Sequence, residues 1–94
     1  MLDVRVVGPG RLRLAGRFDA AQAASVQAVL DQVATTCVIE CDGLEYISSA
    51  GLGVLLATYK RLSASGQTVK LVGMRKLVRD VFRYSRMDTI FEVE

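Results

Sequence analysis

The most informative stretch of this chain reads Glu45-Tyr46-Ile47-Ser48-Ser49-Ala50-Gly51-Leu52-Gly53-Val54-Leu55-Leu56. Two hydroxyl residues stand directly before an apolar run that begins with two glycines. This pattern predicts a loop that enters a helix at Ser48 or Ser49. A helix start leaves backbone N–H groups without intrahelical partners and carries a partial positive charge, so it suits a serine cap and accommodates a phosphate. A hydroxyl here is therefore a candidate switch.

Upstream of this stretch, two short apolar runs cover residues 2–7 and 11–15 and are separated by Gly8-Pro9-Gly10. The second run alternates with period two, and together they predict an antiparallel hairpin. Asp19 then precedes residues 20–34, whose apolar side chains recur at helical spacing. We expect a helix there with Asp19 as its cap.

The following segment, residues 37–41, favours a strand that is covered on both faces, and we expect Gly43 to end it. Downstream, the apolar spacing predicts a helix over 49–64, a strand over 68–72, a helix over 75–84 and a closing edge strand over 90–93. Strands that alternate with helices require crossovers, which place the helices against a sheet. The expected fold class is α/β.

Composition limits the kinds of function. With 94 residues, 51% of them hydrophobic, the chain fits one domain over residues 1–94 with a single core. It contains no histidine, which removes the commonest general base and catalytic metal ligand, so we expect no hydrolytic triad and no metal site such as a zinc centre. Cys37 and Cys41 lie four residues apart in a predicted strand, roughly 13 Å, beyond disulfide reach. We expect both thiols to be reduced.

Targeting signals are not evident in the sequence. No apolar run reaches the roughly 18 residues of a membrane span, and the first residues lack the pattern of a signal peptide. We therefore expect a cytoplasmic protein with no membrane contact. The net charge is +2, but residues 60–86 hold eight basic residues against Asp80 alone. These charges are spread over two predicted helices and a strand, so we expect a solvated face and no direct nucleic-acid contact.

Four motifs in this order resemble a known family, and the likeness covers nearly the whole length. They are Gly16-Arg17-Phe18-Asp19, the Tyr46-to-Leu56 stretch quoted above, Val69-Lys70-Leu71-Val72-Gly73 and Tyr84-Ser85-Arg86-Met87. The chain resembles the anti-sigma factor antagonists, which are the single-domain members of the STAS family. The resemblance implies a STAS-type four- to five-stranded mixed sheet with helices packed mostly on one side.

The resemblance also implies a mechanism. In that family, a partner kinase that doubles as an anti-sigma factor phosphorylates a serine at the start of the second helix. Aligning Gly51-Leu52-Gly53 with the family motif places this serine at Ser49. Two positions depart from the family pattern: Ser48 stands where aspartate is common, and Arg17 where many members carry an acidic residue.

The implied function is a binding switch with no catalysis of its own, so we expect the protein not to be an enzyme and to use no cofactor. The unphosphorylated chain would bind the anti-sigma factor serine kinase and release it when Ser49 is phosphorylated, and a PP2C-type phosphatase would reset the switch. The free protein is expected to be a monomer. The residues expected to bind the partner are Asp19, Ser48, Ser49, Ala50, Gly51 and Gly53.

Other interpretations of the same residues stay open. Without the resemblance, Ser48 and Ser49 are most simply a helix cap. The chain could instead be a STAS scaffold or an accessory subunit of a larger assembly, such as a lipid transport complex, which absence of Ser49 phosphorylation would favour. A nucleotide-binding regulator is a third class, although Gly51-Leu52-Gly53 lacks the lysine of a P-loop. Binding of labelled GTP or ATP would reveal that class.

Overall fold

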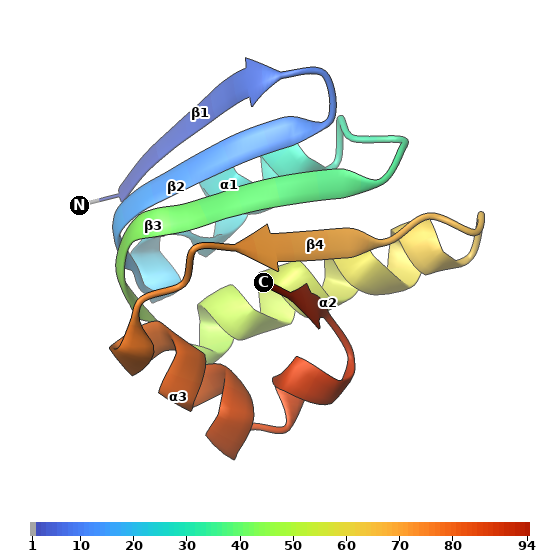
Figure 1. The fold of residues 1–94 in the computed structure, drawn as a ribbon. Coiled ribbons are helices and arrows are strands. Elements are labelled where there is room, and N and C mark those ends of the chain that lie inside the picture. Colours follow the sequence, from blue (N-terminus) through green and yellow to red (C-terminus); the bar gives the residue numbers. More distant parts are fainter. Residues whose placement is uncertain (1) are drawn as a thin grey trace.

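A five-stranded sheet with the strand order β1-β2-β3-β4-β5 organises the computed structural model, which describes residues 2–94 (Figure 1). The predicted domain over residues 1–94 includes Met1, which lies outside the described residues. The elements in chain order are β1 (Leu2–Gly8), β2 (Arg11–Phe18), the 3-10 turn η1 (Ala20–Gln22), α1 (Ala23–Leu30), β3 (Cys37–Ile47), α2 (Ser49–Ser63), β4 (Val69–Val72), α3 (Lys76–Tyr84), the 3-10 turn η2 (Met87–Thr89) and β5 (Glu92–Val93).

The sheet is mixed, as the resemblance implied. β1 and β2 form an antiparallel hairpin in which Val4 lies opposite Leu14, and the remaining neighbours, β2–β3, β3–β4 and β4–β5, are parallel. Gly10 adopts a φ of 65° in the hairpin turn, a conformation that glycine reaches without steric cost. Because three strands run parallel from β2 to β4, the loops after β2 and β3 emerge at the same edge of the sheet.

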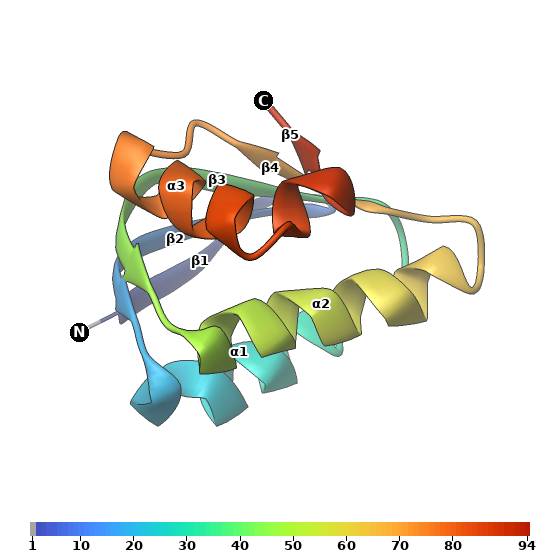
Figure 2. The same cartoon turned by 90° about the horizontal axis from the view of Figure 1, so that it is seen from below.

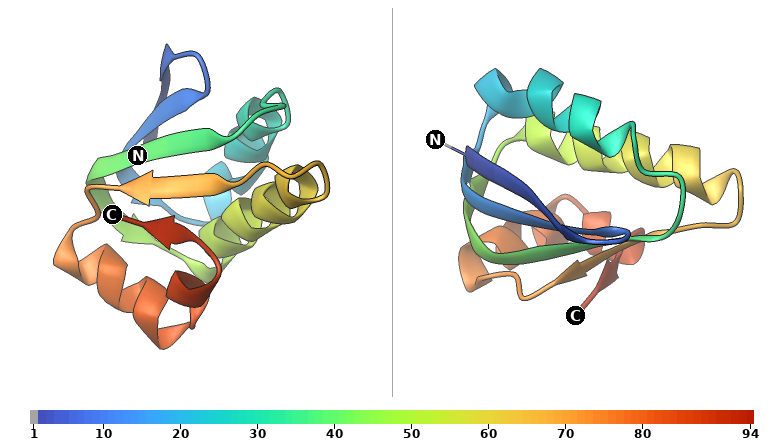
Figure 3. Two further views of the ribbon diagram at one scale, coloured as in Figure 1. Left: turned by 45° about the vertical axis from the view of Figure 1, so that its right-hand side comes forward. Right: turned by 90° about the horizontal axis from the view of Figure 1, so that it is seen from above.

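One face of the sheet carries the helices. α1 and α2 run side by side against it (Figure 2; Figure 3, right). Alternate residues of β2 and β3 point into the core below, so that Leu12, Leu14 and Ile39 are almost completely buried. The α3 side chains of Val78 and Phe82 belong to the same core. The prediction of helices packed mostly on one side is confirmed.

The opposite face of the sheet is open and charged. Arg13 pairs with Asp42 across β2 and β3 at 3.0 Å, and Arg11 pairs with Glu40 in the same way. Exposed ion pairs of this kind contribute about 0–1 kcal/mol each. Polar and charged side chains alternate with core residues along the strands, so this face is exposed to solvent and is not covered by another layer.

The first helix is shorter than predicted, and the expected range of 20–34 was wrong at its end. Asp19 caps the 3-10 turn η1, and α1 itself covers only Ala23–Leu30. Residues 31–36 instead form the return to β3, where the backbone N–H of Thr36 donates to Oε1 of Gln67 at 3.0 Å. A contact to a loop 31 residues away thus overrides the local helical pattern.

The central strand is longer than predicted, because Gly43 does not end β3. Gly43 lies inside the strand opposite Ala15, at a register shift between β2 and β3. A Cβ at position 43 would lie 2.8 Å from the Cβ of Ala15, so the glycine allows β2 to approach closely. β3 then continues to Ile47 and β2 continues to Phe18, beyond the expected end at residue 15.

Candidate functional site

The β3–α2 junction separates the roles of its two serines. Ser48 is extended, with φ −88° and ψ 172°, and its hydroxyl oxygen accepts a hydrogen bond from the Gly51 N–H at 3.2 Å. The Ser48 carbonyl also accepts the Leu52 N–H at 2.9 Å. Ser48 is thus the N-cap of α2. Ser49 is the first helical residue and is exposed to solvent.

No side-chain hydrogen bond within residues 2–94 involves the Ser49 hydroxyl, whereas that of Ser48 is held by the cap. The sequence predicted the helix start at either serine, and the structure places the cap on Ser48. Of the two serines, Ser49 is therefore the one whose hydroxyl is left available.

The two glycines of the motif face different surroundings. Gly51 is buried, and a Cβ there would lie 2.8 Å from Cγ1 of Ile47 and 3.1 Å from Cγ of Phe18. Gly53 is exposed, and no atom lies within 4 Å of the place a Cβ would take. Gly51 consequently lets the first turn of α2 sit against the ends of β2 and β3, while Gly53 leaves a bare patch on the outer side of the helix.

Asp19 lies beside this helix start. The Ser48 N–H donates to the Phe18 carbonyl at 2.9 Å, which ties the end of β3 to the end of β2 directly before Asp19. Oδ1 of Asp19 accepts the Ala21 N–H at 3.2 Å, and Oε1 of Gln22 accepts the Asp19 N–H at 3.0 Å. This capping box holds η1 in contact with α2, and Figure 2 shows the two helical starts next to each other.

Of the predicted partner-binding residues, the structure brings together Asp19, Ser48, Ser49, Ala50 and Gly51 at one edge of the sheet, with Gly53 one turn along α2. Their surface character differs. Ser49 and Gly53 are exposed, Asp19, Ser48 and Ala50 are half-buried, and Gly51 is buried. The outer surface at this edge is made by Ser49 and Gly53, with the Asp19 loop at its side.

One contact at the border of this region is not predictable from local sequence patterns. Arg17 and Tyr46 are paired neighbours on β2 and β3, and the guanidinium carbon of Arg17 lies 4.4 Å from the centre of the Tyr46 ring. Arg17 is exposed, and no ion pair among residues 2–94 involves it. The sequence shows both residues, but the pairing depends on the extension of β2 and β3 beyond their predicted ends.

The two cysteines lie away from this edge, inside β3. Both are free thiols and are buried, which confirms that they do not pair with each other. Burial raises the pKa of Cys37 to about 11. Burial, and the neighbouring Asp42 carboxylate, raise the pKa of Cys41 to about 12. Their thiolate forms are therefore scarce at neutral pH, and neither is suited to nucleophilic chemistry.

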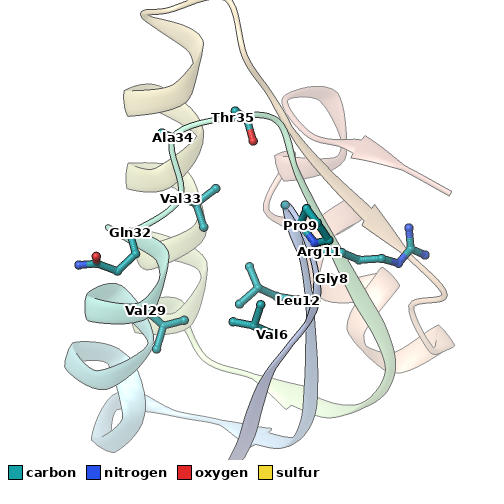
Figure 4. A pocket seen from close by; sticks show the side chains of 11 residues that line it. Val6, Gly8, Pro9, Arg11, Leu12, Val29, Gln32, Val33, Ala34 and Thr35 are labelled. Carbon is teal, nitrogen blue, oxygen red and sulfur yellow. The ribbon is translucent and has the colours of Figure 1, made fainter.

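A separate cavity of about 290 Å³ opens near the hairpin turn (Figure 4). Val6 and Leu12 point toward it from the hairpin, Val29 from α1 and Val33 from the segment that follows α1. None of the predicted site residues lines it, so it is distinct from the Ser49 region. No three His, Cys, Asp or Glu side chains within residues 2–94 are placed to hold a metal ion. Likewise, no helix in this range is long and apolar enough to cross a membrane.

Comparison with known proteins places this geometry in a family. A family model described as "Mlab, STAS domain" matches residues 4–92. A comparison with curated proteins gives no significant match.

Solved structures share the fold at low identity. An anti-sigma factor antagonist from Mycobacterium paratuberculosis is 21% identical with a TM-score of 0.82, covering 99% of this chain and 83% of its own. The unphosphorylated form of the anti-sigma factor antagonist SpoIIAA is 18% identical with a TM-score of 0.73, covering 100% and 87%. The phosphorylated form of the Bacillus cell fate determinant SpoIIAA is 19% identical with a TM-score of 0.71, covering 100% and 91%.

Proposed function

This chain belongs to the STAS domain family, and on that premise we propose that it is an anti-sigma factor antagonist that works as a phosphorylation-controlled binding switch. Unmodified, it binds a kinase-type anti-sigma factor through the surface around Ser49. Phosphorylated on Ser49, it releases that partner. The protein performs no chemistry of its own in this scheme, because the kinase supplies the phosphoryl transfer.

The observation that carries the proposal is the division of roles between Ser48 and Ser49. The cap of α2 is made by Ser48, so modification of Ser49 leaves the cap hydrogen bond in place. The Ser49 hydroxyl is exposed at the first helical position, where a kinase can reach it. A switch residue needs this combination, since its modification must change the surface while the fold persists.

The energetic asymmetry between fold and interface supports release. A phosphate adds a charge of about −1.5 to −2 and three acceptor oxygens. At the start of α2 the helix dipole stabilises such an anion by roughly 0.3–1 kcal/mol, so the fold tolerates it. A partner packed closely against Ser49 must instead remove the phosphate from water, at a cost of several kcal/mol unless it supplies donors. That cost corresponds to a change of orders of magnitude in affinity.

The surroundings suit a protein partner rather than a small ligand. Gly53 leaves the outer side of α2 without a side chain next to Ser49, so a partner's backbone can come close. Asp19 lies beside the helix start, and the Arg17–Tyr46 pair lies where β2 and β3 end. We assign Asp19, Ser48, Ser49, Ala50 and Gly53 to the contact surface. Gly51 is buried beneath this surface and allows the first turn of α2 to pack against Phe18 and Ile47.

The remaining parts of the cycle follow from the same proposal. A PP2C-type phosphatase removes the phosphate from Ser49 and restores binding. The free protein is a monomer in the cytoplasm, and it needs no cofactor or metal because binding and release depend on charge and shape alone.

The test is phosphorylation and binding of matched variants. The chain, Ser48→Ala and Ser49→Ala are each incubated with the cognate kinase and ATP, and the modified residue is mapped by mass spectrometry. We expect phosphate on Ser49 in the parent and in Ser48→Ala, and none in Ser49→Ala, which should stay bound to the kinase. Phosphate found on Ser48 alone would contradict the proposal.

A second candidate function is supported by the family model, which describes a STAS domain of Mlab type rather than the antagonists in particular. In that case the same surface holds a permanent partner, and the chain is an accessory subunit of a larger assembly. The two candidates differ in one readout: an accessory subunit stays bound to its partner regardless of the state of Ser49.

A further inference from the structure

We propose that the outer side of α3 is a second docking surface, which takes an acidic protein segment that carries apolar side chains. This α3 surface consists of Lys76, Leu77, Arg79, Arg83 and Tyr84. It lies on a different helix from Ser49, so the inference goes beyond the switch proposed above.

The first observation is the exposure of two large apolar side chains. Leu77 is 63% exposed and Tyr84 is 80% exposed. They are seven residues apart, which places them on one side of the helix two turns from each other. The inner side of α3 is already satisfied, because Val78 and Phe82 are completely buried in the core. Leu77 and Tyr84 therefore lie outside the core, and the guanidinium carbon of Arg83 lies 5.6 Å from the centre of the Tyr84 ring.

The second observation is the charge next to this apolar pair. Asp80 lies next to this pair on the helix surface and is the only acidic residue within α3. Lys76 and Arg83 lie just beyond Asp80, and Arg79 lies farther round the exposed side, roughly 160° from Leu77 at 3.6 residues per turn. Oδ2 of Asp80 accepts from Lys76 at 2.8 Å and Oδ1 accepts from Arg83 at 3.3 Å, so one carboxylate is shared by two cations. The Lys76 hydrogen bond and charge, together with Arg83, lower the pKa of Asp80. No ion pair within residues 2–94 involves Arg79.

The combination selects the class of partner. A solvated basic face accounts for the charges but not for an exposed leucine and tyrosine beside them. Tyrosine and arginine are enriched in protein interfaces, where an aromatic anchor is surrounded by polar contacts. Excess positive charge on α3 is complemented by a negative surface, which would also speed the encounter. An acidic segment with apolar residues matches both halves of the surface.

Two other classes fit less well. An anionic membrane would need an apolar face to insert, but the apolar stripe of this helix of nine residues is buried in the core. A nucleic acid would use the cations but would gain nothing from Leu77. We therefore argue for the acidic protein segment and treat membranes and nucleic acids as outcomes of the test.

The test is an NMR titration of the full ¹⁵N-labelled chain. The probe is a helical peptide in which glutamates surround apolar residues spaced seven apart, and the matched peptide has glutamine in place of every glutamate. We expect the acidic peptide to shift the amide signals of residues 75–90 and not those of residues 48–53. The glutamine peptide should bind at least about tenfold more weakly, a loss of about 1.4 kcal/mol.

Matched variants separate this surface from general charge effects. Arg79→Glu, and separately Leu77→Ser combined with Tyr84→Ser, should weaken the acidic peptide by about tenfold. Lys60→Glu changes the same charge on α2, and Val6→Ser removes another exposed apolar side chain, so both should change affinity less than about twofold. Ser49→Ala should bind like the parent.

Three results would overturn the inference. The acidic and glutamine peptides could bind equally well, the shifts could fall outside residues 75–90, or Lys60→Glu could weaken binding as much as Arg79→Glu. Vesicles of anionic phospholipid or a DNA duplex that occupied the same residues more tightly than the acidic peptide would assign the surface to those ligands instead.

Discussion

Gly51 lies directly against Phe18: a Cβ on Gly51 would come within 3.1 Å of the Cγ of the Phe18 ring. Phe18 is completely buried, and the same Cβ would lie 2.8 Å from Cγ1 of Ile47, so neither neighbour can move away freely. The start of α2, and with it Ser48 and Ser49, is therefore positioned by a contact that only glycine permits.

This contact predicts opposite effects for the two glycines of the motif. Gly51→Ala should lower the free energy of unfolding by about 1–3 kcal/mol, because the methyl group overpacks the core. Gly53→Ala should leave it unchanged or raise it by up to about 1 kcal/mol, because the site is open and alanine favours the helix. Urea denaturation of both variants checks this, and equal effects would show that Gly51 is not constrained by packing.

The two serines should differ in stability as they do in geometry. Ser48→Ala removes the cap of α2 and should cost about 0.5–2 kcal/mol. Ser49→Ala removes an exposed hydroxyl and should change the free energy of unfolding by less than about 0.5 kcal/mol. Both are measured in the same denaturation series. A larger loss of stability in Ser49→Ala than in Ser48→Ala would contradict the assignment of the cap to Ser48.

Arg17 borders the proposed contact surface, and we expect it to contribute to partner binding more than to the fold. An exposed cation–π pair such as Arg17–Tyr46 stabilises by about 0.5–1 kcal/mol, so Arg17→Ala should unfold at nearly the same denaturant concentration as the parent. We expect its affinity for the kinase to fall by about tenfold. Arg13→Ala is the control, because Arg13 lies on the same strand but pairs with Asp42 on the open face of the sheet. If both variants lost the same amount of affinity for the kinase, Arg17 would have no specific role in the interface.

The cysteines predict how stability depends on alkaline pH. Burial raises the pKa of Cys37 from 9.0 to about 11 in the folded protein. Above pH 9 the unfolded chain releases this proton while the folded chain keeps it, so the free energy of unfolding should fall as pH rises from 9 toward 11. The variant Cys37→Ala should show a shallower fall over the same range.

A thiol reagent at pH 8 should also react with both cysteines only after unfolding, and rapid reaction with the native protein would contradict their burial.

Local signals predicted much of this structure. Turn residues and hydrophobic spacing predict the order of strands and helices. The capping preferences of Asp and Ser predict the role of Asp19 and the start of α2, because all of these signals lie close together in the sequence. The ends of elements were less predictable, because tertiary contacts decide them. α1 ends at Leu30 where the chain turns back to meet Gln67, and β3 passes through Gly43 because Ala15 of β2 approaches there.

The candidate site shows the same division. The sequence placed Ser48, Ser49 and Asp19 at helix starts, and the parallel β2–β3 pair brings those starts together. The buried role of Gly51 was not evident, because the walls that require it, Phe18 and Ile47, come from two different strands. The Arg17–Tyr46 pair likewise exists only because both strands extend to the edge of the sheet.

The central claim is that phosphate on Ser49 changes an interface and not the fold. The most direct measurement is the dissociation constant for the kinase, determined by calorimetry with unmodified protein and with protein phosphorylated only on Ser49. Urea denaturation of both forms is run alongside as the control for folding. We predict that the phosphorylated form binds at least about a hundredfold more weakly, equivalent to about 2.7 kcal/mol, while the free energies of unfolding agree within about 1 kcal/mol. Dissociation constants within twofold of each other, or a phosphorylated form that no longer folds, would contradict the account.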